Sequence, residues 1–234
     1  MAGLGLFMRR RGLATHPAVV DILKDSLIGA YSFAGKSNGD ADWNIVKDMS
    51  GKGEDLKILG MTPSGSDGYQ ADGSFYKDST SKGYCQVALP PLQEITIIVK
   101  RKRYTLQAWQ CFLSVPLPSN SDTAILYMDQ NGTNNVYDAH SCRSFTHYIK
   151  DSSINSSDGV MWMNSDMFNN KTMGKASVNY APFSGGNLYI GKISASTIAN
   201  NWRIYSLYIF NKSLTPELIE QFIQENIDES YVLP

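Results

Sequence analysis

Hydrophobic and polar positions alternate in short runs along most of this chain, which is the pattern of half-buried β-strands. The clearest run, residues 94–100, consists almost entirely of β-branched side chains, which favour strands. Between two later runs, Asn131-Gly132 is a strong hairpin signal. The pattern predicts strands at 27–33, 55–59, 84–89, 94–100, 107–115, 123–128, 144–150, 160–163, 187–191 and 202–210.

The last strand carries large apolar side chains at spaced positions, and we expect four of them on one face: Trp202, Ile204, Tyr208 and Phe210. By contrast, residues 60–83 are rich in Gly, Ser and Asp, so this stretch is expected to be a long surface loop.

One helix is predicted over residues 215–227, with three signals at its start. Thr215 is an N-cap residue type, Pro216 suits the first helical position, and Glu217 complements the positive end of the helix. The apolar residues that follow recur at helical spacing, at Leu218, Ile219, Phe222, Ile223 and Ile227. A weaker, shorter helix is expected over 17–25.

About ten strands at short spacing, followed by one late helix, indicate an all-β sandwich. No sequence repeat of fixed period is present, which argues against a propeller or a solenoid. We expect an N-terminal basic arm, residues 1–25, and a β-sandwich domain, residues 26–234, that ends in the helix 215–227.

Charge and composition argue against several classes of function. The 234 residues hold 21 Lys and Arg against 22 Asp and Glu, so a general nucleic-acid binder is not expected. No run of eighteen apolar residues occurs, so no membrane span is predicted, and the N-terminus lacks the charge order of a secretory signal. The three cysteines, Cys85, Cys111 and Cys142, have no disulfide or zinc spacing and are expected to be inert core thiols.

Three segments occur in a distinctive order. Residues 27–33 precede the turn Asp48-Met49-Ser50-Gly51-Lys52-Gly53-Glu54-Asp55-Leu56, residues 94–100 follow, and the tail joins Leu188-Tyr189-Ile190-Gly191 to residues 202–217. This series spans residues 27–227 and resembles the concanavalin A-like jelly roll in its laminin-G-like branch. The resemblance implies a concanavalin A-like jelly-roll β-sandwich with a short C-terminal helix, which we expect to close the open end of the core.

The N-terminal arm carries Arg9, Arg10 and Arg11 and no acidic residue before Asp21. With the Gly-Leu-Ala-Thr-His-Pro-Ala-Val-Val that follows, it resembles the start of such domains in virion proteins of phages and prophages of gut bacteria. The resemblance implies that the three arginines anchor the domain to other virion or surface protein subunits. A frayed terminus and a nucleic-acid-binding arm are the alternatives. The second basic run, Lys100-Arg101-Lys102-Arg103, is expected to be a solvated strand end, with a patch for an acidic polysaccharide or partner subunit as the alternative.

Catalytic patterns are missing from the sequence. Glycosidases of this jelly roll place two carboxylates on one strand as Glu-x-Asp-x-x-Glu, and no Glu here has that spacing. The three histidines, His16, His140 and His147, accompany no nucleophile elbow. We therefore expect a protein that is not an enzyme, with a divergent glycoside hydrolase as an alternative.

Binding residues are predicted where aromatic and polar side chains mix, because sugar sites combine a stacking ring with a few placed polar groups. Two stretches have this mixture, and the candidate ligand-binding residues are Tyr137, Asp138, His140, Trp162 and Asn164. The alternative for Trp162 is an ordinary core position on an alternating strand. No cofactor is expected except calcium, whose candidate ligands are Asp129, Asp138, Asp158 and Asp166, although they are scattered. Asp48 is instead expected to bond its own turn.

Together these observations favour a non-catalytic, surface-exposed structural or adhesive module on a phage virion, as a capsid decoration, head-fibre or tail-associated protein that binds bacterial surface glycans. A stand-alone carbohydrate-binding module is the alternative, with the bacterial cytoplasm or the extracellular medium as the alternative location. A homo-oligomer is compatible with this role, but no coiled-coil heptad demands one.

Overall fold

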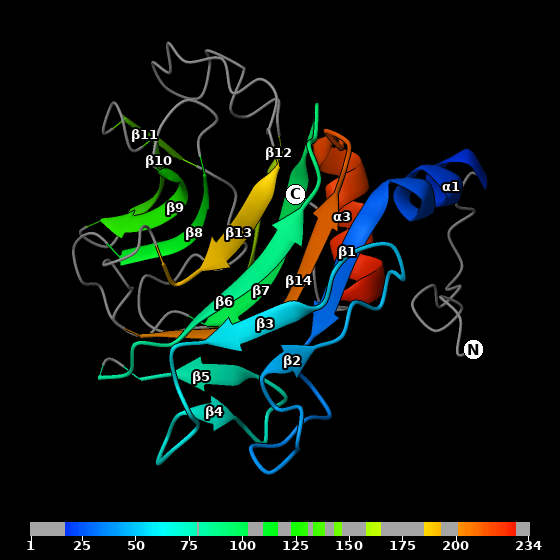
Figure 1. The fold of residues 1–234 in the computed structure, drawn as a ribbon. Helices are drawn as coiled ribbons and strands as arrows, with labels where there is room; N and C mark the ends of the chain where they lie inside the picture. The colour runs from blue at the N-terminus through cyan, green and yellow to red at the C-terminus, as the bar shows by residue number, and fades with distance from the viewer. Residues whose placement is uncertain are drawn as a thin grey trace.

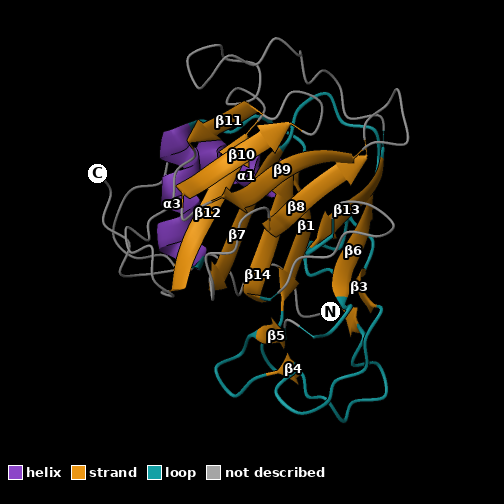
Figure 2. Ribbon diagram, turned by 90° about the vertical axis from the view of Figure 1, so that its left-hand side faces the viewer, coloured by secondary structure: helices purple, strands orange, loops and turns teal. Residues whose placement is uncertain are grey.

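The computed structural model describes residues 17–78, 80–102, 110–116, 123–130, 133–138, 143–146, 158–164, 185–192 and 201–227. Within these ranges the chain forms two antiparallel sheets, which we call sheet A and sheet B, and two helices on one side of sheet A (Figures 1 and 2). The described residues therefore confirm the predicted all-β sandwich with a short C-terminal helix.

Sheet A has β14 at its centre. The strand order is β12-β7-β14-β5-β4, and β1 pairs with the far end of β14, on the same side as β5. Its strands are β1 (Leu27–Ser32), β4 (Gly68–Tyr69), β5 (Phe75–Lys77), β7 (Thr96–Lys102), β12 (Asp158–Asn164) and β14 (Trp202–Phe210).

Sheet B is longer and curls at one end, as Figure 2 shows. Its order is β11-β10-β9-β8-β13-β6-β3-β2. The strands are β2 (Ile45–Val46), β3 (Leu56–Leu59), β6 (Tyr84–Leu89), β8 (Gln110–Pro116), β9 (Thr123–Gln130), β10 (Thr133–Asp138), β11 (Arg143–Thr146) and β13 (Gly186–Ile190). The pairing of Gln130 with Thr133 across two intervening residues confirms the predicted Asn-Gly hairpin.

The predicted loop 60–83 contains β4 and β5, which form a small hairpin at the end of sheet A. Strands of two and three residues are too short to produce a recognisable alternation. Phe75 of β5 is nevertheless fully buried and contacts Trp202 with ring centroids 6.0 Å apart. The expectation of a surface loop is wrong for this part of the segment.

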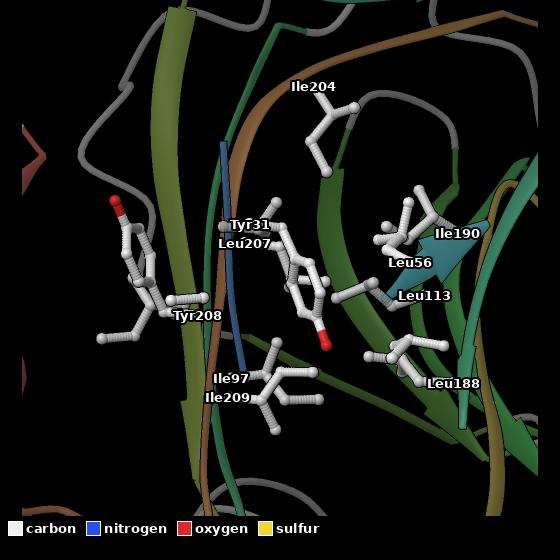
Figure 3. Packing of buried hydrophobic residues seen from close by; sticks show 14 of the residues in the cluster. Tyr31, Leu56, Ile97, Leu113, Leu188, Ile190, Ile204, Leu207, Tyr208 and Ile209 are labelled. Carbon is white, nitrogen blue, oxygen red and sulfur yellow. The ribbon is translucent and has the colours of Figure 1, made fainter. Parts of the chain in front are cut away.

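The core lies between the two sheets and is built from their inward-facing apolar side chains. Figure 3 shows Ile97, Leu207 and Ile209 of sheet A opposite Leu113 and Leu188 of sheet B. Cys85, on β6, is fully buried, and this burial raises the pKa of its thiol. Cys85 therefore has the inert character that we expected of a core thiol, whereas the side chains of Cys111 and Cys142 lie outside the described residues.

A β-bulge changes which face the side chains of β14 occupy. The register between β14 and β7 shifts between Ile204 and Ser206, and Ile204 and Leu207 both face the core (Figure 3). Because one extra residue reverses the alternation of a strand, Tyr208 and Phe210 face the opposite side. The prediction that all four large residues of β14 share one face is therefore wrong.

The opposite side of sheet A is covered by α3 (Pro216–Asn226). Phe222 of α3 packs edge-on against Tyr208 and Phe210, with ring centroids 5.0 and 5.2 Å away. Thr215 is the N-cap, and its hydroxyl accepts from the amide of Leu218 at 3.5 Å. The predicted helix start is confirmed, but α3 lies against the outer face of sheet A instead of closing the open end of the core (Figure 2).

The shorter helix, α1 (Pro17–Ser26), also belongs to the folded body. Leu23 is buried in the hydrophobic core cluster, and Ser26 accepts through its carbonyl from the amide of Asn211 at 2.8 Å. The carbonyls of Lys24 and Asp25 accept from the ammonium of Lys52, at 2.8 and 2.9 Å. The predicted arm of residues 1–25 therefore includes a helix that packs on the sandwich, and residues 1–16 lie outside the described residues.

The 48–53 turn is organised by one carboxylate. Asp48 accepts from the amides of Ala30 (2.8 Å), Ser50 (3.0 Å), Lys52 (3.1 Å) and Gly53 (2.8 Å). The hydroxyl of Ser50 donates to the same carboxylate at 2.7 Å. A Cβ on Gly53 would overlap the carbonyl oxygen of Ile28, so only glycine fits there. The expectation that Asp48 bonds its own turn is confirmed, and the turn also joins β1.

No helix in the described part of the chain is long and apolar enough to cross a membrane.

Candidate functional site

The outward side of sheet B carries an unusual group of aromatic and polar side chains. On β6 and β13, Cys85, Val87, Leu188 and Ile190 point into the core, so the residues between them point outward. The outward residues of these two strands, together with Lys192 just after β13, form what we call the tyrosine face: Tyr84, Gln86, Asn187, Tyr189 and Lys192. All five are partly exposed.

Two tyrosines form the centre of this face. Their rings lie at 66° to each other with centroids 6.1 Å apart. The ammonium of Lys192 lies 4.1 Å from the ring centroid of Tyr84 and 5.2 Å from that of Tyr189, which is cation–π distance. The hydroxyl of Ser114, on β8, donates to the carbonyl of Lys192 at 2.5 Å and fixes the backbone there.

Amide groups lie beside the rings. The Asn187 side chain donates to the hydroxyl of Tyr189 at 3.3 Å, which orients the ring and leaves the amide oxygen as an acceptor. Gln86 pairs directly with Tyr189 across β6 and β13, and Lys57 of β3 pairs with Gln86. Aromatic rings, amides and a cation therefore lie in one row across three neighbouring strands.

The side chains of the tyrosine face are of types that bind sugars. Tyrosine rings offer apolar surface to the C–H side of a sugar, while amides and ammonium groups bind hydroxyls or carboxylates. None of the five residues is a carboxylate, a histidine or a cysteine, and the groups on the face that can transfer protons or act as nucleophiles are the two tyrosine hydroxyls and the Lys192 ammonium.

A second polar cluster lies on sheet A, beyond the part that α3 covers. The carboxylate of Asp72 accepts from the guanidinium of Arg203 at 2.6 Å, from the hydroxyl of Tyr205 at 3.1 Å and from the hydroxyl of Ser74 at 2.5 Å. Burial opposes ionisation of Asp72, but these bonds and the Arg203 charge outweigh it and lower its pKa. Because these groups bind one another, we interpret the cluster as a connection between β14 and the 70–74 turn.

Of the predicted ligand-binding residues, the structure describes the side chain of Trp162 alone. Tyr137 and Asp138 lie on β10 and Asn164 ends β12, but their side chains are outside the described residues, as is the whole of His140. Trp162 is described, and it is only 5% exposed. Its ring is therefore not available for stacking on a sugar, and the alternative of a packing role fits this burial.

The predicted calcium ligands lie on different strands. Asp129 is on β9, Asp138 is on β10, and Asp158 begins β12 of the other sheet, where it pairs with Lys102. The side chains of these three residues and the whole of Asp166 lie outside the described residues. Among the side chains that are described, no three His, Cys, Asp or Glu residues gather as metal ligands. Calcium binding stays a prediction.

The basic run 100–103 is only partly a solvated strand end. Lys100 is half-buried on the outer face of sheet A, with its ammonium 5.5 Å from the ring centroid of Tyr205. Arg101 is 6% exposed and pairs with the core residue Ile204, so it points into the sandwich, and the expectation of solvent is wrong for it. The anchoring residues Arg9, Arg10 and Arg11, like Arg103, lie outside the described residues.

The sequence analysis missed the tyrosine face because it looked for single stretches in which aromatic and polar residues are mixed, and not for outward residues shared by two strands. A signal was present: in the predicted strands 84–89 and 187–191, Tyr and amide residues alternate with apolar ones. Their outward direction follows from the period of two. The adjacency of the two strands does not, since about a hundred residues separate them in the chain.

Comparison with known proteins bears on the fold alone. No protein-family model matches this chain, and a search of curated proteins by sequence finds no match. Solved structures do match. The binding domain of Botulinum neurotoxin serotype D superposes with a TM-score of 0.55 at 12% identity, over 86% of this chain and 51% of that chain.

Two further structures show the same fold. The binding domain of Botulinum neurotoxin DC, in complex with SialylT, has a TM-score of 0.51 at 12% identity and covers 88% of this chain and 53% of that one. A Trypanosoma rangeli sialidase bound to a difluoro-nononic acid has a TM-score of 0.50 at 11% identity, over 96% of this chain and 38% of that one. This chain thus spans about half or less of each neighbour, and it has the lectin-like β-sandwich fold found in these proteins.

Proposed function

We propose that this protein is a non-catalytic carbohydrate-binding module with an adhesive, surface-exposed role, and that the tyrosine face is its binding surface. The observation that carries the proposal is the contact between the rings of Tyr84 and Tyr189, which are partly exposed and flanked by amides and Lys192, at outward positions of β6 and β13 where no residue is a carboxylate. The glycan-bound neurotoxin binding domain supports it only as a precedent for the fold, because the match covers about half of that chain.

Three properties of the face fit a sugar. Its rings belong to rigid neighbouring strands, so they lose little conformational freedom on binding. The hydrogen bond from Asn187 holds the Tyr189 ring. Gln86 adds a second amide in direct register with that ring. A sugar ring that lies on Tyr189 therefore has hydrogen-bonding groups beside it, which is the arrangement that orients polyhydroxylated ligands.

The non-catalytic role is part of the proposal. Of the described glutamates, Glu54 lies just before β3, Glu94 accepts from the amide of Ser213 near the start of α3, and Glu217, Glu220 and Glu225 lie on α3 itself. Most glycosidases use two carboxylates across the scissile bond, and sialidases, which use a tyrosine nucleophile, are an exception. The pattern needed for that pair is absent from the sequence, and the tyrosine face offers none. Release of reducing sugar from any polysaccharide, lost on replacing one carboxylate, would establish the hydrolase alternative.

The setting that we propose is the surface of a phage virion, with the arginine-containing N-terminal segment as the anchor to another subunit. The support is the resemblance of this segment to virion proteins. The test is deletion of residues 1–16, which precede α1. The shortened protein should keep its folded sandwich and lose incorporation into particles, and retained incorporation would refute the anchor.

The binding proposal is tested with the purified full chain on an array of bacterial surface glycans, with and without a calcium chelator. Tyr189→Ala should weaken binding about fivefold or more, since central tyrosines contribute upwards of ~1 kcal/mol to interfaces. Tyr189→Phe keeps the ring and should retain most of the affinity. Tyr76→Ala, at an outward position of sheet A, is the matched control.

Absence of binding to every glycan would refute the proposal, as would equal losses from Tyr189→Ala and Tyr76→Ala. Loss of binding on chelation alone would move the site to the predicted calcium ligands.

A further inference from the structure

We infer that the tyrosine face selects an acidic glycan, one whose sugars carry carboxylate groups, and that Lys57 is the residue that recognises the charge. This inference rests on the proposed function, because it names the class of ligand for the same surface. The inference comes from the charged residues around the tyrosine face, because a role of the aromatic residues alone does not account for those charges.

Lys57 is placed to reach a sugar that lies on Tyr189. It is an exposed, outward residue of β3 and pairs with Gln86, which in turn pairs with Tyr189. Two strand spacings therefore separate the backbones of Lys57 and Tyr189, about 10 Å. The long lysine side chain can cover much of that distance while its ammonium stays in water.

Of the carboxylates close to Lys57 in the chain, Glu54 is exposed just before β3, and two others are already bound to other groups. Asp55 accepts from the ammonium of Lys47 at 2.6 Å and from the amide of Asp48 at 3.0 Å. Asp42, near β2, forms an ion pair with Lys36 at 3.2 Å. In the part of the chain that the structure describes, Lys57 forms no ion pair, so its charge is available to a ligand.

Among the described outward positions of β3, β6 and β13, none is occupied by an acidic residue. On β3, β6 and β13 the described outward residues are Lys57, Leu59, Tyr84, Gln86, Ala88, Asn187 and Tyr189. Lys192 adds a second ammonium above the tyrosine rings. A face with this composition attracts anions and disfavours cations, which gives selectivity between ligands of the same shape.

The expected loss of affinity follows from the exposure of the Lys57 side chain. Pairs between an exposed lysine and a carboxylate contribute about 0.2–1 kcal/mol, so the loss of Lys57 should weaken binding of an acidic glycan about 1.4- to fivefold. Salt screens such pairs, so the preference for the acidic ligand should shrink as sodium chloride is added.

The test compares two polymers with the same sugar backbone, polygalacturonic acid, which carries carboxylates, and its methyl ester, in which they are neutral. Binding of both is measured by calorimetry for the full chain and for three variants, Lys57→Gln, Tyr189→Ala and Lys24→Gln. Lys24 is an exposed lysine on α1, so its replacement is the matched control for loss of one positive charge. Circular dichroism checks that each variant is folded.

The expected result is tighter binding of the acid than of the ester, with a preference that falls in Lys57→Gln and persists in Lys24→Gln. Equal binding of both polymers, abolished by Tyr189→Ala, would overturn the inference and leave the proposed function intact. The same holds if only neutral glycans of the array bind through Tyr189. Absence of binding to either polymer and to every arrayed glycan would instead refute the proposed function itself.

Discussion

Replacement of Asp48 by alanine should destabilise the sandwich more than any other single change in a turn. Its carboxylate accepts four backbone amides and one hydroxyl, all between 2.7 and 3.1 Å. Hydrogen bonds to a charged group contribute about 1.5–3 kcal/mol each and are not additive when they share one acceptor. The amides of Ser50, Lys52 and Gly53 can turn to water, whereas Ala30 is 4% exposed.

The loss therefore combines one buried unpaired amide with several weakened turn bonds. We expect Asp48→Ala to lower the free energy of unfolding by about 3–5 kcal/mol, a large share of the 5–15 kcal/mol typical of a domain. Urea unfolding followed by tryptophan fluorescence measures it. Asp40→Ala is the control, because Asp40 accepts only from the amide and hydroxyl of Ser37 in an exposed turn. Equal effects of the two substitutions, both below about 1 kcal/mol, would refute the reasoning.

The same carboxylate predicts a pH dependence. Burial opposes ionisation of Asp48, but the hydrogen bonds from Ser50, Ala30 and Gly53 outweigh it, so the pKa lies below the ordinary value of 3.8. In the window between the two pKa values the unfolded chain binds more protons than the folded chain. The stability that Asp48 contributes is thus present above pH 3.8 and lost as the pH falls through the folded pKa. Asp48→Ala should lack this part of the acid dependence.

Two further predictions concern buried side chains. Phe222→Ala should lower the free energy of unfolding in urea by about 3–5 kcal/mol, since it removes the ring between α3 and sheet A. Glu217→Ala, at the exposed start of the helix, should lower it by less than about 1 kcal/mol. Equal losses would contradict the packing of α3. Burial of Lys77, which is 1% exposed, lowers its pKa from 10.5 to about 8. Because the folded chain then binds fewer protons, Lys77 should increase the stability of the wild type relative to Lys77→Met as the pH rises from 8 to 10.5. A difference that does not change with pH would show that Lys77 titrates normally.

Much of the fold could be predicted because the strands alternate cleanly. The bounds of β6 and β14 agree with the sequence prediction, and the Thr215 cap marked the start of α3. The bulge in β14 could not be predicted, since Ile204 to Phe210 are so apolar that either phase of alternation places large residues in a core. α3 packs against Tyr208 and Phe210, two of the residues whose direction this alternation left ambiguous.

The candidate site was harder to predict than the fold. Tyrosines on a predicted strand resemble core residues, so no function was predicted for Tyr84 and Tyr189. Their contact also depends on the long-range pairing of β6 with β13. Similarly, an arginine or lysine within a strand is normally expected in solvent. The burial of Arg101 and Lys77 follows from the register of β7 and β5 on β14, which no local pattern contains.

The turn around Asp48 has a consequence for self-association. β1 lies at an edge of sheet A, where unpaired backbone groups would form a template for another chain. At Ala30 both groups are occupied, since its amide donates to Asp48 and its carbonyl accepts from the amide of Met49 at 2.8 Å. The turn therefore acts as a cover for the exposed edge of the sheet. A domain displayed in many copies would need such a cover to keep the copies from joining edge to edge.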